Sequence, residues 1–273
     1  MKTLFVSDLD GTLLNDDARL SARTIAMLNE AISAGALFTV ATARTAATVD
    51  VLLQDVDMQL PAIVMTGATL WDCKKKDYKA LNYFDEVDAG YIFRLFAQYD
   101  VCPFTYTLPY GRNILEVYYD NPHPSQVDIS FKEARATLPL KHFVTGKPSS
   151  FANVLLFYAS GNRKTMQDLS KRIAESTRLS VSCYDDIYNP GTSLIEVFAG
   201  GVSKARAIQN LRGMLGVDRV VVFGDNLNDL PMFRVADTSV AVENSALETL
   251  KAADVVIGKN TDDSVAKFIL STL

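Results

Sequence analysis

Short apolar runs alternate with helical patterns over the first 70 residues of the chain. Apolar runs begin at Leu4 and lie at residues 36–41 and 62–65, and each breaks into polar or turn-forming residues. Such runs are typical of buried strands in a parallel sheet. Between them, Ser21 is expected to cap one helix, and residues 49–53 are expected to lie in a second. This β-α-β-α-β order predicts an α/β fold with a right-handed, doubly wound parallel sheet.

The pattern changes in the middle of the chain. Tyr and Phe become frequent, and apolar residues alternate with polar ones at residues 114–119 and 179–184. Alternation of this kind indicates antiparallel strands with one face toward water. Helical periodicity lies near residues 89–99 and 163–177. We therefore expect an inserted α+β domain at residues 82–198.

The α/β pattern returns after this insert. Ser203 is expected to begin a helix that Gly216 ends. Three further apolar runs are short enough to be strands: 220–223, 239–242 and 255–257. The expected core domain is therefore discontinuous and consists of residues 1–81 and 199–273.

Composition excludes several classes of function. The chain has 273 residues, and its net charge of −5 argues against a general nucleic-acid surface. Its 3 cysteines are scattered without a CxxC pair, which disfavours a zinc site and a disulfide framework. No apolar run is long enough for a transmembrane helix. We expect a cytoplasmic protein with no nucleic-acid or membrane partner, and no protein partner is implied.

Carboxylates follow two of the predicted buried strands. Asp8 and Asp10 come directly after the first strand, Asp225 and Asp229 follow a later one, and the hydroxyl of Thr42 follows the second. If the strand geometry persists, the first two carboxylates point to the same side. Ligands of open parallel sheets bind beyond the carboxyl ends of the strands. Several carboxylates without matching His or Cys residues favour Mg²⁺.

These residues carry a resemblance to a known family. In chain order, the motifs are Asp8-Leu9-Asp10-Gly11-Thr12, Thr42, Lys204 and Gly224-Asp225-x-x-Asn228-Asp229. Together they resemble the four motifs of the haloacid dehalogenase (HAD) superfamily. The position of the insert and the form of the last motif resemble the Cof-type branch, subfamily IIB, with a C2B cap. The resemblance covers essentially the whole chain. It implies a Rossmann-like core with an inserted α+β cap domain, and phosphatase activity on small phosphorylated metabolites, with sugar phosphates as the expected class.

The resemblance also implies catalytic roles. Asp8 would attack phosphorus and form an aspartyl-phosphate, one of the known covalent carboxylate intermediates. Asp10 would protonate the leaving alcohol and later activate water, while its backbone carbonyl binds Mg²⁺. The side chains of Asp8 and Asp225 would ligate the metal, which offsets the repulsion between carboxylate and phosphate.

Phosphate contacts are implied for four further residues. Thr42 and Lys204 would hold phosphate oxygens, and Asn228 would assist them. Asp229 would orient Lys204 or a metal-bound water. Arg44 fits a role in binding substrate charge, but a salt bridge explains it equally well.

Several of these residues have ordinary structural explanations as well. Thr42 could cap the following helix, and Asp225 could belong to a turn after a strand. Asn228 and Asp229 could cap the helix before Pro231. Lys204 lies in the first turn of a helix, where a cation opposes the helix dipole, so a functional role is the stronger interpretation.

The sequence departs from the usual family pattern at three positions. Ala43 and Ser264 stand where the family commonly has Gly, and Thr66 stands where it has Asn. Two other functions stay open at this point. One is a phosphomutase with the same nucleophile, and the other is a catalytically silent binding or regulatory protein. The physiological substrate, the cap contacts and the oligomeric state do not follow from the sequence.

Overall fold

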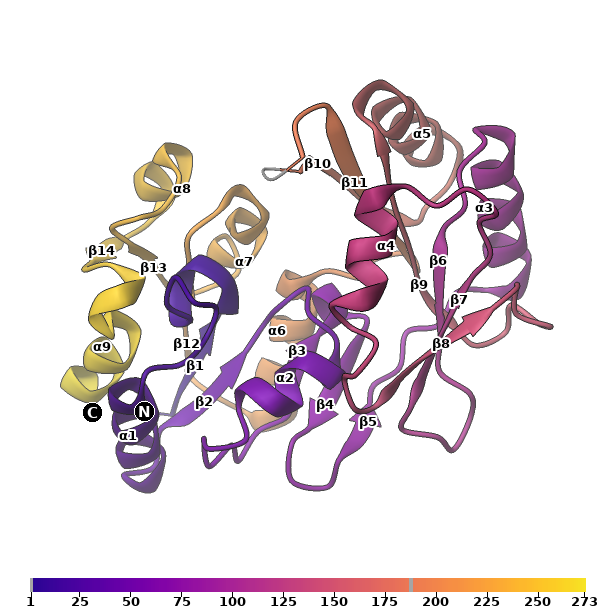
Figure 1. Ribbon diagram of the computed structural model, residues 1–273. Coiled ribbons are helices and arrows are strands. Elements are labelled where there is room, and N and C mark those ends of the chain that lie inside the picture. Colours follow the sequence, from indigo (N-terminus) through magenta and orange to yellow (C-terminus); the bar gives the residue numbers. More distant parts are fainter. Residues whose placement is uncertain (1, 187–188) are drawn as a thin grey trace. The chain divides into compact units, whose positions relative to one another are not determined.

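The structure of the chain is a computed structural model that describes residues 2–186 and 189–273 (Figure 1). The chain divides into two compact units, which we call the core unit and the insert unit. The core unit consists of Met1–Ala80 and Ser203–Leu273, and the insert unit is Leu81–Val202. The domain borders expected from the sequence, at residues 81/82 and 198/199, stay a prediction.

Five parallel strands form the main sheet of the core unit, in the order β14-β13-β12-β1-β2. Their bounds are Thr3–Ser7 (β1), Leu37–Val40 (β2), Arg219–Gly224 (β12), Thr238–Val242 (β13) and Val255–Ile257 (β14). Because β1 and β12 are neighbours, the segments that follow them leave the same edge of the sheet side by side. The expected α/β class with a parallel core sheet is confirmed.

Helices cover both faces of this sheet (Figure 1). Their bounds are Ala22–Ser33 (α1), Ala46–Leu52 (α2), Lys204–Leu215 (α6), Leu230–Phe233 (α7), Leu247–Ala252 (α8) and Ser264–Thr272 (α9). On one face, Ile208 of α6 packs with Leu4 and Val222 of the strands. On the other face, Phe268 of α9 contacts Phe223 of β12, with ring centroids 5.5 Å apart. This two-sided burial explains why the strands are apolar on both faces.

The predicted helix caps of α1 and α6 are present. The Ser21 hydroxyl accepts a hydrogen bond from the N–H of Thr24 at 2.9 Å, and Ser203 accepts one from Arg206 at 3.1 Å. Gly216 ends α6 in the left-handed conformation, with φ 57°. Short helical turns complete the core unit: Leu9–Leu13, Met65–Gly67, Leu227–Asp229 and Asn260–Asp262.

The third strand predicted from the sequence exists but belongs to a different sheet. It spans Ala62–Val64 (β3) and pairs antiparallel with Thr69–Asp72 (β4), which pairs with Asp77–Lys79 (β5). A single parallel bridge, between Ala41 and Ile63, joins it to the end of β2. The tight turn directly after β3 sends the chain back along it, so the expected continuation of the parallel sheet stops there.

The insert unit is built on a six-stranded mixed sheet in the order β10-β11-β9-β6-β7-β8. The strands are Phe104–Thr107 (β6), Leu115–Tyr119 (β7), Lys141–Thr145 (β8), Val154–Asn162 (β9), Ser180–Asp185 (β10) and Thr192–Phe198 (β11). The helices are Glu86–Gln98 (α3), Gln126–Glu133 (α4) and Arg163–Ser176 (α5). All pairs are antiparallel except β7 with β8. This confirms the expected inserted α+β region.

The two faces of this sheet pack differently. On one face, side chains such as Phe96 of α3 and Leu169 of α5 form a core with Ile195 of β11. On the opposite face, Phe131 of α4 stacks on Tyr158 of β9, with ring centroids 4.6 Å apart. The alternating pattern in the sequence therefore separates an apolar face from a face rich in aromatic and polar groups.

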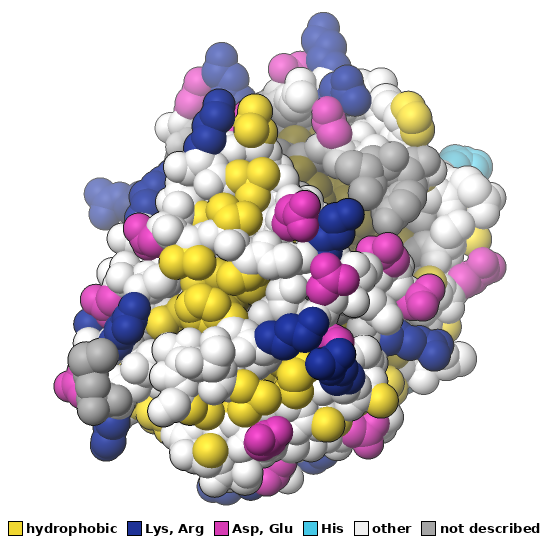
Figure 2. All heavy atoms as spheres, turned by 90° about the vertical axis from the view of Figure 1, so that its left-hand side faces the viewer, with side chains coloured by type: hydrophobic (Ala, Val, Ile, Leu, Met, Phe, Trp, Pro, Cys, Tyr) yellow, Lys and Arg dark blue, Asp and Glu magenta, His cyan; other side chains and the backbone are white. Residues whose placement is uncertain are grey.

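The face of the molecule drawn in Figure 2 is mixed in charge. Figure 2 shows one face of the molecule, on which Lys and Arg side chains lie interspersed with Asp and Glu side chains. Among the helices of residues 2–186 and 189–273, none combines the length and apolar character needed to cross a membrane.

Candidate active site

The loop after β1 carries Asp8 into the end of the core sheet. The N–H of Asp8 donates to the carbonyl of Phe223 on β12 at 2.9 Å, and its side chain is buried. Gly11 then turns the chain with φ 72°. A Cβ at this position would lie 2.4 Å from Oδ2 of Asp225, so only glycine permits this approach. The glycine of the motif therefore serves to bring the two acidic segments together.

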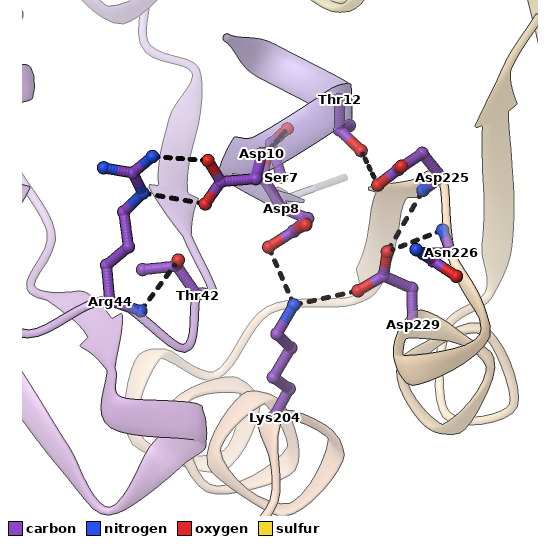
Figure 3. A network of polar contacts seen from close by, with 10 residues as sticks. All are labelled: Ser7, Asp8, Asp10, Thr12, Thr42, Arg44, Lys204, Asp225, Asn226 and Asp229. Carbon is purple, nitrogen blue, oxygen red and sulfur yellow. Dashed lines mark hydrogen bonds and ion pairs between the residues drawn. The ribbon is translucent and has the colours of Figure 1, made fainter. Parts of the chain in front are cut away.

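Lys204 joins two of the buried acids (Figure 3). Its Nζ donates to Oδ1 of Asp8 at 2.7 Å and to Oδ1 of Asp229 at 2.9 Å, and the lysine side chain is only 4% exposed. Burial alone would lower the pKa of Lys204, but the two carboxylates together raise it above its ordinary value. The amine is thus a fixed positive charge at the start of α6.

The Asp229 carboxylate accepts hydrogen bonds from the loop after β12 in addition to the one from Lys204. Its Oδ2 accepts hydrogen bonds from the backbone N–H groups of Asp225 at 3.1 Å and Asn226 at 3.2 Å. The Asn226 side chain in turn accepts from the N–H of Leu227 at 2.7 Å. Both oxygens of Asp229 are therefore engaged by donors of the protein.

Asp225 lies on the opposite side of the cluster from Lys204 (Figure 3). The Thr12 hydroxyl donates to its Oδ1 at 3.0 Å. Burial, followed by the charge of Asp229, raises the pKa of Asp225 to about 6. Burial likewise raises the pKa of Asp8 to about 7, although Lys204 opposes the shift. The acids are held where water stabilises their charge poorly.

The donor set fits a divalent cation. Asp8, Asp225 and Asp229 each offer an oxygen, and these oxygens lie within 4.8 Å of one another. Lys204 supplies one positive charge against three carboxylates, so the cluster retains negative charge. Hard oxygen donors with excess negative charge suit Mg²⁺.

Asp10 lies outside this cluster. Its carboxylate accepts from Nε of Arg44 at 2.7 Å and from Nη2 at 2.5 Å, and its side chain is 54% exposed (Figure 3). The expected common direction of Asp8 and Asp10 required strand geometry beyond Ser7, but β1 ends there. The structure thus shows the salt bridge that was one of the two interpretations of Arg44.

Thr42 and Asn228 are placed differently from each other. The buried Thr42 hydroxyl accepts from the N–H of Arg44 at 3.1 Å, whereas Thr45 occupies the cap position of α2. The side chain of Asn228 is exposed and makes no hydrogen bond within the described part of the chain. The structure therefore brings Thr42 into the strand-end loop but leaves Asn228 outside the polar network.

Three residues of the network were not assigned a role from the sequence. Thr12 contacts Asp225, and Asn226 forms a capping box with Asp229. An Asn followed three residues later by an acid is a recognisable signal for such a cap. Asn244, in the loop after β13, donates from Nδ2 to the Gly11 carbonyl at 2.8 Å. No local pattern indicates this last contact, because it depends on how distant loops meet.

Comparison with known proteins identifies the family in which this arrangement of groups occurs. The model of the haloacid dehalogenase-like hydrolases matches residues 5–269. The chain belongs to this family. The resemblance to its Cof-type branch, subfamily IIB, is confirmed, and the protein is a phosphatase, a phosphoric monoester hydrolase.

Two relatives and one structure illustrate the similarity of this HAD phosphatase to others. The 5-amino-6-(5-phospho-D-ribitylamino)uracil phosphatase YwtE of Bacillus subtilis is 26% identical over 96% of this chain and 95% of its own. The pyridoxal phosphate phosphatase YbhA of Escherichia coli is 26% identical over 97% of each chain. The structure of the HAD subclass IIB sugar phosphatase BT4131 aligns with a TM-score of 0.75 and 21% identity, over 100% of this chain and 99% of that one.

Proposed function

We propose that this enzyme is a Mg²⁺-dependent phosphatase that hydrolyses small phosphorylated metabolites through an aspartyl-phosphate on Asp8, with sugar phosphates as the expected class. The observation that carries the proposal is the buried Asp8 carboxylate, which Lys204 holds at 2.7 Å beside Asp225. The activities for which the similar proteins are named support the substrate class. They concern a ribitylaminouracil phosphate, pyridoxal phosphate and sugar phosphates, all of which are small.

Asp8 performs the first step of the proposed reaction. Lys204 binds its Oδ1, so the second carboxylate oxygen is the one that attacks phosphorus. A bond forms between this oxygen and phosphorus, and the bond from phosphorus to the alcohol oxygen breaks. Asp10 gives its proton to the leaving alcohol. It then accepts a proton from the water that attacks phosphorus, which frees Asp8 and releases inorganic phosphate.

Asp8, Asp225 and the backbone carbonyl of Asp10 are the groups that would hold Mg²⁺. When bound, the metal supplies positive charge that offsets the repulsion between carboxylates and phosphate. Asp229 takes a supporting role, because Lys204 and two backbone N–H groups already engage its oxygens. It fixes Lys204 against Asp8 and stiffens the loop that carries Asp225.

The phosphate oxygens would meet donors from three segments. Lys204 and the Thr42 hydroxyl supply the inner contacts, and Asn228 supplies one from the loop before α7. Two donors of Arg44, Nε and Nη2, hold the ionised Asp10 carboxylate in the structure. In this proposal Arg44 therefore turns from Asp10 to the charge of the substrate, which leaves Asp10 able to take up the proton that it gives to the leaving alcohol. Positioning and charge neutralisation are the main contributions of a protein to phosphoryl transfer.

Phosphate release from p-nitrophenyl phosphate and from a panel of sugar phosphates tests the proposal. We expect turnover with Mg²⁺, none with EDTA, and a loss of about a thousandfold or more in Asp8→Asn. The variant should keep the far-UV circular dichroism of the parent, because Asn has nearly the shape of Asp. Equal background rates with Mg²⁺ and with EDTA would favour a silent protein. Turnover that needs an added bisphosphate and releases no free phosphate would favour a mutase.

A further inference from the structure

The loop after β1 is closed by a backbone hydrogen bond and held by two asparagines from other loops. The N–H of Leu14 donates to the carbonyl of Leu9 at 2.9 Å, which closes the turn around Gly11. Asn244, from the loop after β13, donates from Nδ2 to the carbonyl of Gly11 at 2.8 Å. Asn260, in the turn after β14, donates from its Nδ2 to the carbonyl of Leu14 at 2.8 Å. The two amides therefore hold this turn in its middle and at its end.

A further hydrogen bond joins the two asparagines. The backbone N–H of Asn260 donates to Oδ1 of Asn244 at 2.9 Å. Because the oxygen of the Asn244 amide accepts this bond, the nitrogen of the amide is the end that faces Gly11. Asn244 thus bridges a backbone donor and a backbone acceptor from two segments that are distant in the sequence. Both ends of its amide are engaged.

The glycine at position 11 explains why such support matters. Gly11 has φ 72° and ψ −5°, and a Cβ at this position would meet the Asp225 carboxylate. The position therefore requires glycine, whose backbone is freer than that of any other residue. The hydrogen bond from Asn244 holds the peptide group directly after Gly11. It restrains the residue of the turn that has the most conformational freedom.

Asp10 depends on this backbone more than Asp8 does. Asp8 is buried, and its N–H and its carboxylate are bound by β12 and by Lys204. The Asp10 side chain is 54% exposed, and its carboxylate is held by Arg44. When Arg44 turns to the substrate, as in the proposed reaction, the position of Asp10 depends on its own backbone. The restraint on that backbone lies one residue later, at the Gly11 carbonyl.

We propose that Asn244 is a positioning residue: it holds the turn at Gly11 and thereby keeps the carboxyl group of Asp10 at the leaving alcohol oxygen during proton transfer. Asn260 supports this role by fixing the orientation of the Asn244 amide. Asn244 acts through backbone atoms and not by contact with the substrate. The effect on proton transfer rests on the proposed function, whereas the restraint on the turn does not.

A pair of similar substrates tests the effect on proton transfer. p-Nitrophenolate is a stable anion that leaves without a proton, whereas phenyl phosphate reacts faster when its leaving oxygen is protonated. We expect Asn244→Ala to lower kcat/KM for phenyl phosphate, relative to p-nitrophenyl phosphate, by about fivefold, the factor that corresponds to one hydrogen bond. Both are measured at saturating Mg²⁺, and their ratio does not depend on the fraction of folded enzyme. Equal losses with both substrates would overturn the proposal.

Asn29 of α1 provides a matched control, because its amide makes the same kind of bridge. Its Nδ2 donates to the Asp55 carbonyl at 2.9 Å, and its Oδ1 accepts from the Asp57 N–H at 2.7 Å. Asn29→Ala should leave the substrate ratio unchanged. Asp10→Asn should lower the ratio, and adding Asn244→Ala to it should lower the ratio no further, because the positioned acid is already absent. A further decrease in the double variant would contradict an action through Asp10.

NMR relaxation of the ¹⁵N-labelled enzyme tests the restraint without a substrate. We expect the order parameters of the Gly11 and Thr12 N–H groups to fall from about 0.85 to about 0.6 in Asn244→Ala. Gly35, another glycine with positive φ, should keep its value. Unchanged order parameters at Gly11 and Thr12 would overturn the proposal. A fall at these residues, together with a parental substrate ratio in Asp10→Asn, would confirm the restraint and overturn the acid role of Asp10 in the proposed function.

Discussion

Lys204 is the residue on which the buried charges of the active site depend. It lies between Asp8 and Asp229, and the latter is fully buried. Removing one partner of a buried ion pair leaves an uncompensated charge in a poorly solvated place. Loss of Lys204 would leave three neighbouring carboxylates without its positive charge, because Asp225 lies in the same cluster as Asp8 and Asp229.

We therefore expect Lys204→Met to lower the free energy of unfolding by about 3–5 kcal/mol and to abolish most activity. Mg²⁺ should raise the melting temperature of this variant more than that of the parent, since the remaining cluster is more negative. Thermal unfolding with Mg²⁺ and with EDTA measures both effects. Arg206→Met, which removes an exposed cation of the same helix, is the control. An equal response to Mg²⁺ in variant and parent would contradict this view of Lys204.

At the scale of residues, the sequence predicts which groups meet but not how each one points. Asp8 and Asp225 could be expected to lie together, because each follows a strand of the parallel sheet. Lys204 could be expected beside them, because it begins the helix that leads to the second of these strands. A salt bridge is one of the two interpretations of Arg44 that the sequence allows, but its partner, Asp10, could not be predicted. The pairing depends on the turn at Gly11, whose backbone angles are set by close approach to a distant segment.

At the scale of elements, the turn after β3 decides the edge of the core unit. Met65, Thr66 and Gly67 all have positive φ values, of 50°, 57° and 95°. The chain reverses there, and β3 therefore pairs with β4 instead of continuing the parallel sheet. The sequence pattern predicts the strand correctly but not its partner, because no glycine or asparagine stands at the first two positions of this turn.

Thr66 occupies a conformation that suits a β-branched residue poorly. With φ 57° and ψ 19° it lies in the left-handed region, where asparagine is tolerated better. We expect Thr66→Asn to raise the free energy of unfolding by about 1 kcal/mol. Thr66→Val keeps the branched side chain and should give no gain. Denaturant unfolding compares the three proteins, and equal stability of the asparagine and valine variants would refute the explanation.

At the scale of the whole molecule, the change in hydrophobic period along the chain predicts an insert. Alternation in the middle corresponds to the mixed sheet of the insert unit, and the flanking apolar runs correspond to the parallel sheet of the core unit. The face of the insert-unit sheet that carries Lys141, Tyr106, Tyr158 and Glu196 could not be predicted, since these residues lie on four separate strands, β8, β6, β9 and β11. Lys141 in particular looks like an ordinary polar residue at the start of a strand.

The buried Lys141 gives the stability of the enzyme a defined pH dependence. Its pKa is about 7 in the folded protein, against about 10.4 for an unfolded lysine. Between these values the unfolded chain binds more protons, so this group makes the folded state more stable as pH rises. Its full penalty applies below about pH 7 and is lost by about pH 10.4.

Lys141→Met removes this penalty. We expect the variant to exceed the parent in unfolding free energy by the largest margin below about pH 7, with the margin shrinking toward about pH 10. Denaturant unfolding across this range measures the margin, and Lys132→Met provides a control whose margin stays flat. A margin independent of pH would show that burial does not lower the pKa of Lys141.

The account as a whole depends on a covalent bond between phosphorus and Asp8. Borohydride reduces an aspartyl-phosphate to homoserine, so quenching the enzyme with borohydride during turnover and mapping its peptides by mass spectrometry tests this bond. We predict homoserine at position 8 when substrate and Mg²⁺ are both present, and none in Asp8→Asn. Homoserine at position 10, or an unmodified Asp8 in an enzyme that releases phosphate, would contradict the mechanism.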